Sequence, residues 1–115
     1  MNHHFLHSLL AQSARHNPDQ TAIWSDSGCL SYAELEATSN QLAHTLQAAG
    51  IKQGDRMGIY LDKSPAAIIA LFAIMKAGAA YIPLDPDAPS RRIEFIIENS
   101  GMAGLVTDSA KLSSL

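Results

Sequence analysis

The 115-residue sequence has little cysteine, little charge and no long hydrophobic run, and each shortage excludes a class of protein. Its single cysteine cannot build a disulfide framework or a zinc site made of cysteines. The longest apolar run, Ala66 to Met75, has ten residues, about half of what a membrane-spanning helix requires. No charged segment followed by an apolar stretch indicates a secretion signal, so we expect a cytoplasmic protein.

Charge is sparse and slightly acidic. Eight Lys and Arg against eleven Asp and Glu give a formal net charge of −3, with no basic stripe, so we expect neither a nucleic-acid partner nor a membrane. Charged residues make up 17% of the chain, whereas soluble domains average about 25%. A small domain has proportionally more surface to solvate. The shortage therefore indicates that other polypeptide covers part of this surface.

Apolar spacing and turn residues predict an α/β fold in one unit, residues 1–115, without a second domain. The expected helices are 3–16, 31–50, 64–78 and 90–99, the expected strands are 21–24, 29–32, 56–61, 79–82 and 103–107, and residues 111–115 could begin a further helix. The first two strands predict a short hairpin. From residue 56 onward strands and helices alternate, which favours a parallel βαβαβ sheet flanked by helices.

Two helix starts are marked by capping residues. Ser31 and Glu34 have the spacing of a capping box, in which each side chain bonds the backbone N–H of the other residue. The helix that follows is expected to bury Leu35, Leu42, Leu46 and Ala49. Ser64 followed by Pro65 predicts the start of the next helix. That helix is apolar on all sides, so we expect it to be buried on more than one side.

Motifs that bind nucleotides or carry nucleophiles are absent from the sequence. No three-glycine dinucleotide fingerprint, GxxxxGK[ST] phosphate loop or GxSxG elbow is present. His3, His4 and His7 are the nearest approach to a metal cluster, and His3 and His7 share a predicted helix face. Structural zinc needs four ligands, so a solvated surface is the favoured interpretation, as it is for His16 and His44.

Other candidate residues also have plain structural explanations. Asp85 and Asp87 could bind magnesium or perform acid–base chemistry, but Asp beside Pro favours a turn in which the carboxylate bonds its own backbone. Tyr81 is expected to be a packed aromatic residue. Arg91 and Arg92 are expected to be a solvated pair at the start of a helix.

Cys29 lies on a predicted strand, without a basic residue within three positions. A thiol in such a setting is not activated. We therefore expect an inert, buried side chain.

Two stretches of the sequence resemble core motifs of one family. Residues 30–35, LSYAEL, resemble the first core motif of the AMP-forming adenylating enzymes, and residues 75–86, MKAGAAYIPLDP, resemble the second. These enzymes include adenylation domains of nonribosomal peptide synthetases, acyl-CoA synthetases and luciferases. Residues 89–100 look like the adenylation-domain branch in particular, and the resemblance extends from about residue 5 to 108.

The resemblance implies an activity for the complete family enzyme. Such enzymes use ATP and Mg²⁺ to activate a carboxylic acid as an acyl-adenylate, and then transfer the acyl group to phosphopantetheine or coenzyme A. In the family, the phosphate loop, the nucleotide-binding motifs, the acid pocket and the catalytic lysine all follow the region matched here. We therefore expect no catalytic, cofactor-binding or metal-binding residue in this chain.

The favoured hypothesis is an N-terminal part of an adenylation domain that is inactive alone. The first alternative is a split or regulatory module that docks onto a chain carrying the remaining motifs, and the second is part of an acyl-CoA synthetase. An independent small binding domain is the least favoured interpretation. The expected partners are the rest of the adenylation domain or a carrier protein, and exposed apolar surface could cause self-association.

Overall fold

The computed structural model describes residues 6–26 and 28–115, and it has the α/β architecture that the sequence predicts. The elements in chain order are α1 (Leu6–His16), β1 (Thr21–Ser25), β2 (Gly28–Ser31), α2 (Tyr32–Ala48), β3 (Arg56–Tyr60), α3 (Pro65–Lys76), β4 (Ala80–Pro83), α4 (Ser90–Asn99), β5 (Gly104–Thr107) and α5 (Ser109–Ser113). The expected hairpin and the alternation of strands and helices are both confirmed.

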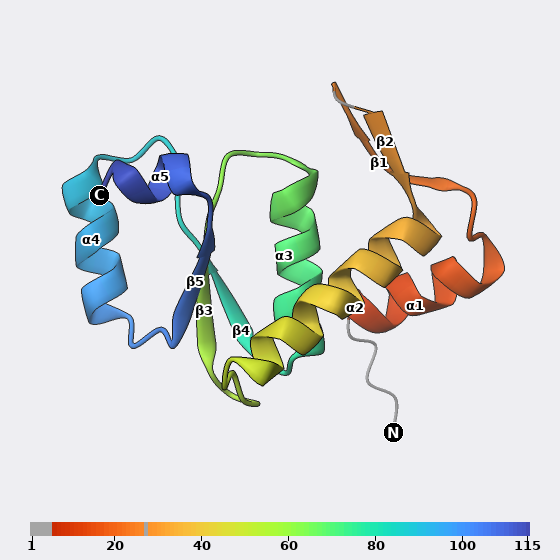
Figure 1. The fold of residues 1–115 in the computed structure, drawn as a ribbon, viewed down its shortest axis with the longest axis horizontal. Helices are drawn as coiled ribbons and strands as arrows, with labels where there is room; N and C mark the ends of the chain where they lie inside the picture. Colours follow the sequence, from red (N-terminus) through yellow and green to blue (C-terminus); the bar gives the residue numbers. More distant parts are fainter. Residues whose placement is uncertain (1–5, 27) are drawn as a thin grey trace.

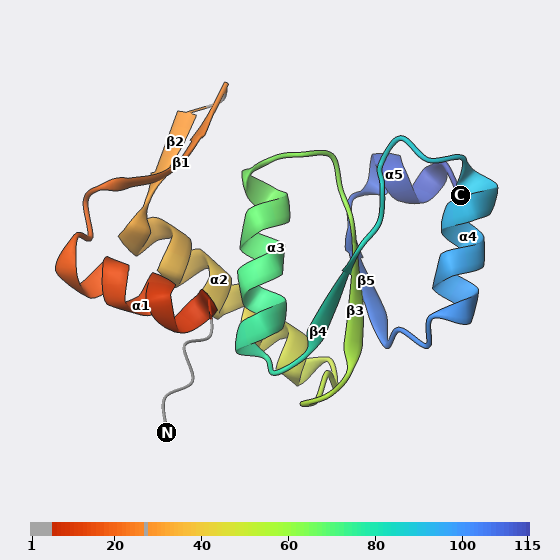
Figure 2. The same ribbon diagram turned by 180° about the vertical axis from the view of Figure 1, so that it is seen from behind.

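Strands β3, β4 and β5 form one parallel sheet in the order β4-β3-β5. The sheet stands between two helical layers, with α3 on one side and α4 and α5 on the other (Figure 1). Helices α2 and α1 lie beyond α3, and the hairpin of β1 and β2 projects from that end of the molecule (Figure 2). The carboxyl ends of the three parallel strands therefore meet at a single edge of the sheet.

Three apolar clusters hold these layers together. The largest joins α2 and α3 to one face of the sheet, around the fully buried side chains of Ala70, Ala73 and Ile74. A second lies under α4, around Ile93 and Tyr60, on the other face. The third joins α1 and the hairpin to α2 around Leu35. Helix α3 thus contacts the sheet on one side and α2 on another, although Ile68 near its start is 39% exposed.

The capping box at the start of α2 is confirmed. The backbone N–H of Glu34 donates to Ser31 Oγ at 3.1 Å, and the N–H of Ser31 donates to a Glu34 carboxylate oxygen at 2.8 Å. Tyr32, which was predicted to end the second strand, is instead the first residue of α2. Because Ser31 satisfies the N–H of Glu34, the helix can begin at once after the strand.

The buried face of α2 differs in part from the predicted one. Leu35 and Leu46 are buried as expected, but Ala49 is exposed and follows the last helical residue. Ser39 is fully buried in its place, and its hydroxyl donates to the carbonyl of Leu35 at 2.7 Å. The helix therefore buries a polar residue by satisfying its hydroxyl within the preceding turn.

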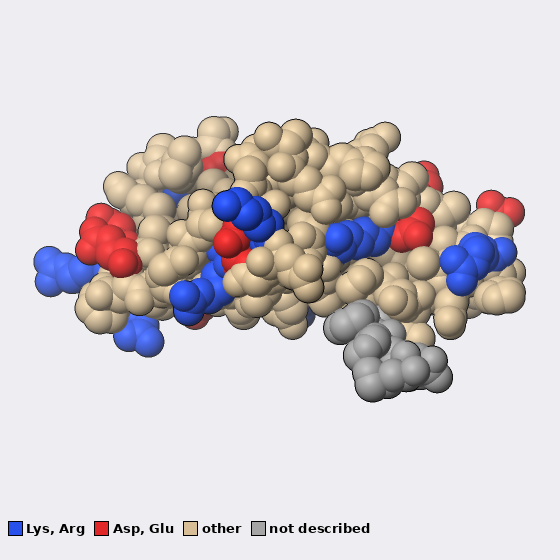
Figure 3. Space-filling view, turned by 90° about the horizontal axis from the view of Figure 1, so that it is seen from below, with Lys and Arg blue, Asp and Glu red and all other residues tan. Residues whose placement is uncertain are grey.

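Positive and negative side chains are interspersed on the face of the molecule seen in Figure 3, with uncharged surface between them. Among the described residues, no helix is both long enough and apolar enough to cross a bilayer.

Candidate functional site

The strongest candidate site lies at the carboxyl edge of the parallel sheet. Open α/β sheets bind ligands outside the carboxyl ends of their strands, where successive connections leave in opposite directions. Here the connection from β3 leads to β4 on one side of β3, and the connection from β4 leads to β5 on the other side of β3. The point where the direction changes therefore lies between β3 and β5. A hollow of about 320 Å³ opens there, lined by Tyr60, Asp62, Pro86, Ala88, Ser90, Asp108, Ala110, Lys111 and Ser114.

Lys111 is the central charged group of this hollow. Its ammonium lies 2.8 Å from Asp62 Oδ1 and donates to the carbonyl of Pro86 at 3.2 Å. The same nitrogen lies 5.8 Å from the centroid of the Tyr60 ring, within the range of a cation–π contact. The hydrogen bond to Asp62 raises the pKa of Lys111, and the charge of Asp87 adds to that effect. The ammonium therefore stays charged and joins three segments of chain.

Hydrogen bonds fix α5 across the strand ends. Asp108 caps α5 by accepting from the N–H of Lys111 at 2.7 Å. Ser90 Oγ, at the start of α4, donates to the carbonyl of Ser114 at 2.7 Å, and Tyr60 Oη lies 3.4 Å from Ser114 Oγ. The polar groups around this hollow thus bond one another.

These residues do not fit ATP and Mg²⁺ by themselves. A triphosphate needs cations or free backbone N–H groups, but the one cation of the hollow, Lys111, is already bonded to Asp62 and Pro86. Asp108 also places a carboxylate over the first turn of α5. Within residues 6–26 and 28–115, no three His, Cys, Asp or Glu side chains are grouped to hold a metal ion.

Asp85 and Asp87 lie in the turn after β4. The N–H of Asp87 donates to Asp85 Oδ1 at 2.9 Å, and the N–H of Ala88 donates to the carbonyl of Asp85 at 3.1 Å. These bonds confirm that Asp85 stabilises its own turn. Of residues 85–87, Pro86 lines the hollow beside Lys111, whereas Asp85 and Asp87 do not.

The predicted histidines are dispersed. His3 and His4 lie outside the described residues, and His16 and His44 are exposed. His7 is half-buried on α1 beside Lys76. Burial lowers the pKa of His7, and the positive charge of Lys76 lowers it further, while Glu36 acts in the opposite direction. His7 is therefore a neutral packing residue at pH 7.

Two predictions about single residues are wrong. Cys29 is exposed, because the hairpin projects from the body and only one of its faces packs against α1 and α3. Tyr81 is 42% exposed, because β4 is an edge strand of the sheet. Arg91 and Arg92 are exposed on the outer face of α4, as predicted.

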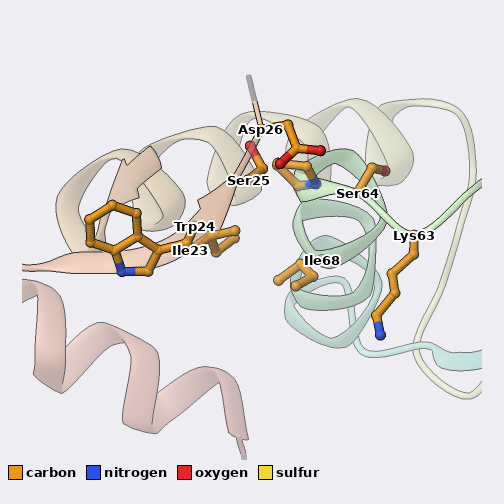
Figure 4. A pocket seen from close by; sticks show the side chains of 8 residues that line it. Ile23, Trp24, Ser25, Asp26, Lys63, Ser64 and Ile68 are labelled. Atoms are coloured by element: carbon orange, nitrogen blue, oxygen red, sulfur yellow. The ribbon is translucent and has the colours of Figure 1, made fainter. Parts of the chain in front are cut away.

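An apolar hollow that the sequence did not indicate lies between the hairpin and α3. Its volume is about 500 Å³, and Figure 4 shows Ile23 of β1 and Ile68 of α3 on opposite sides of it. Trp24, at its rim, is 81% exposed. A neighbouring hollow shares Ile23 and Ile68 and extends to the exposed Leu6 and Leu9 of α1. Leu6, Leu9, Trp24 and Ile68 therefore leave exposed apolar surface around these two hollows.

The comparisons with known proteins agree with this architecture. The sequence model of the family described as AMP-binding enzyme matches residues 10–115. The chain therefore belongs to the AMP-binding enzyme family.

Curated relatives within the family include peptide synthetases. The chain is 47% identical over 107 residues to a linear gramicidin synthase of Brevibacillus parabrevis. It is 43% identical over 106 residues to the phosphinothricin tripeptide synthetase PhsC of Streptomyces viridochromogenes. These matches cover 93% and 92% of this chain but only 2% and 10% of the relatives. The chain thus spans a small part of the curated proteins that it matches.

Solved structures place the fold within one subdomain. The N-terminal subdomain of Klebsiella oxytoca NpsA, in complex with anthranilyl-AMSN, matches with a TM-score of 0.84 and 28% identity, over 91% of this chain and 27% of that one. The o-succinylbenzoate coenzyme A synthetase MenE of Bacillus subtilis, in complex with AMP, matches with a TM-score of 0.80 and 30% identity, over 88% and 26%. The fold is therefore that of the N-terminal subdomain of adenylating enzymes.

Proposed function

We propose that this chain supplies the opening scaffold of an ATP-dependent adenylation unit that activates an amino acid or another carboxylic acid in nonribosomal peptide synthesis. The observation that carries the proposal is the match to peptide synthetases at 47% and 43% identity over almost the whole chain. Both of these curated relatives are peptide synthetases, which favours the peptide synthetase branch over an acyl-CoA synthetase.

In this proposal the chain stabilises the fold of the adenylation unit, and other polypeptide supplies the catalytic and nucleotide-binding residues. Lys111, the cation at the carboxyl edge, is bonded to Asp62 and Pro86, and it holds α5 in place. ATP and Mg²⁺ would bind only when the remaining adenylation polypeptide supplies a phosphate cradle. The reaction would use ATP from the cytoplasm, so we propose that the assembled unit is located there.

The exposed apolar surface around Trp24 supports the proposal that this chain packs against other polypeptide. A small protein that exposes Leu6, Leu9, Trp24 and Ile68 on one side carries the kind of patch that another polypeptide covers. The rest of an adenylation domain is the partner that the family match favours, whether it belongs to the same chain or to a separate one.

A chimera tests the scaffold role. In the phosphinothricin tripeptide synthetase PhsC, the segment that matches this chain would be replaced by residues 10–115 of this sequence, the range that the family model matches. Exchange of labelled pyrophosphate into ATP would be measured with the acid substrate of that synthetase. We expect exchange to persist in the chimera and to be absent from the isolated 115-residue chain. A folded chimera without exchange would refute the scaffold role, and exchange by the isolated chain would refute its inactivity.

A further inference from the structure

His7 lies at the contact between the first helix and the centre of the fold. Helix α1 packs against α2 and α3, and Figure 2 shows it alongside α2. His7, in the first turn of α1, is half-buried and lines a hollow of about 330 Å³ together with Lys76 of α3. All the residues of this contact belong to this chain, so the contact does not depend on further polypeptide.

Two charged side chains act on His7 from the helices packed against α1. Lys76 of α3 disfavours a proton on the imidazole, whereas Glu36 of α2 favours one. The remaining residues that line the hollow carry no charge: Gln53, Met75, Gly78 and Ala79. Burial and Lys76 together outweigh Glu36, so the pKa of His7 lies below 6.5. A positive charge in the first turn of a helix is also disfavoured by the helix dipole.

Apart from this contact, few apolar groups of the chain hold α1 in place. Leu10 is the one buried residue of the described helix Leu6–His16, and it joins the cluster around Leu35. Elements with few buried apolar contacts open locally at a lower cost in free energy than the core. An isolated helix of 11 residues is also marginal in water, so α1 should unwind when it leaves α2 and α3.

We propose that His7 is an acid-sensitive latch for α1, in which a proton on the imidazole releases α1 from α2 and α3 while the rest of the chain stays folded. The proton places a second cation beside Lys76 in a half-buried site, and the repulsion is relieved when His7 moves into water. Because the open state binds a proton more readily than the closed state, acid favours the open state. The latch does not depend on the proposed function.

Hydrogen exchange of the unmodified chain tests the latch. Protection factors for the amides of residues 10–15 in α1 and 57–59 in β3 would be measured between about pH 7.5 and about pH 5. In acid, the open fraction of α1 should rise towards about tenfold for each unit by which the pKa of His7, measured by NMR, lies below 6.5.

The comparison of α1 with β3 shows whether α1 opens alone. At both ends of the pH range, the amides of α1 should be less protected than those of β3, because only complete unfolding exposes the central strand. Equal protection of the two elements would mean that α1 opens only when the whole chain unfolds, and it would overturn the proposal. An open fraction of α1 that does not change while His7 titrates would overturn it as well.

Matched histidine variants separate His7 from the other described histidine of α1. His7→Gln keeps a polar side chain without a titrating group, so the protection of α1 should no longer depend on pH over this range. His16, at the other end of α1, is exposed, and His16→Gln should keep the dependence of the native protein. Circular dichroism establishes that both variants are folded. A dependence that survives in His7→Gln, or is lost in His16→Gln, would overturn the proposal.

A variant of Glu36 tests the repulsion that drives the latch. Glu36→Gln removes the negative charge that favours a proton on His7, and it leaves the charge of Lys76 without its ion-pair partner. The pKa of His7 should therefore fall further below 6.5 than in the native protein, and the rise in the open fraction of α1 should extend to lower pH. An unchanged pKa of His7 in the folded variant would show that these charges do not control the imidazole, and it would overturn the proposal.

Discussion

Lys76 on α3 and Glu36 on α2 form an ion pair between residues forty positions apart in the sequence. Their side chains are only 10% and 23% exposed. The same ammonium donates to Ser39 Oγ at 2.6 Å and to Asn40 Oδ1 at 2.9 Å. One cation thus satisfies three side chains of α2, and it fixes how the two helices pack.

Replacement of Lys76 by Met should therefore destabilise the fold. The change leaves the Glu36 carboxylate largely buried without its cation, and breaking such pairs costs about 3 kcal/mol. Urea unfolding followed by circular dichroism would measure the loss. The double variant Lys76→Met with Glu36→Gln should lose less than the sum of the two single changes. A loss in Lys76→Met that falls within experimental error would show that the pair does not hold the helices together.

The capping box gives a second prediction. Ser31→Ala removes the oxygen that accepts from the N–H of Glu34, and loss of such a cap costs about 1 kcal/mol. Ser31→Thr keeps a capping hydroxyl and should retain most of the stability. Thermal unfolding of the three proteins measures the difference. If the Thr variant is as unstable as the Ala variant, the hydroxyl is not the stabilising group.

The close packing around Gly58 on β3 predicts that a larger side chain at this position destabilises the fold. A Cβ at this position would lie 2.8 Å from Leu105 Cδ1 and 2.8 Å from Met102 Sδ. Both atoms are at the ends of flexible side chains, so Gly58→Ala should fold but lose about 1–3 kcal/mol through overpacking. Met102→Ala should cost less in the Gly58→Ala background than in the native protein, because it makes room for the new methyl group. Strictly additive losses would refute this contact.

His7 predicts a pH dependence of stability. Its pKa in the fold is lowered from 6.5 by burial and by Lys76, so the unfolded chain binds a proton at a higher pH than the folded one. Stability should therefore be highest above pH 6.5 and should fall as the pH decreases from 6.5 towards the folded pKa. His7→Gln should remove this part of the dependence, whereas His44→Gln, at an exposed position, should not. Urea midpoints measured between about pH 7.5 and about pH 5 compare the three proteins.

Local signals in the sequence were enough to predict most of the secondary structure. The Ser31 cap, the Ser64–Pro65 start and the glycine at position 78 lie within a few residues of the ends that they determine. Gly78 adopts a φ of +83°, which favours glycine, and α3 ends two residues before it. Such signals depend on neighbouring residues and can therefore be recognised without a tertiary structure.

The errors concern residues whose surroundings depend on distant segments. Cys29 and Tyr81 were expected to be buried, but one lies on a projecting hairpin and the other on an edge strand. Ser39 was overlooked because a polar residue on an apolar face is unfavourable until its hydroxyl finds a partner, here the carbonyl of Leu35. The Lys111 contacts at the carboxyl edge join α5 to the loops after β3 and β4, and no short motif indicates them.

The central position of β3 in the sheet has a consequence for protein synthesis. Strand β4 pairs directly with β3, and α3 connects the two strands along the chain. These three elements can therefore assemble as soon as they have left the ribosome. Strand β5 is translated later and joins the side of β3 that is still vacant. A pause in translation at which Pro83 has left the ribosome but β5 has not should therefore yield a nascent chain with a two-stranded core, and hydrogen exchange on stalled ribosomes would detect it.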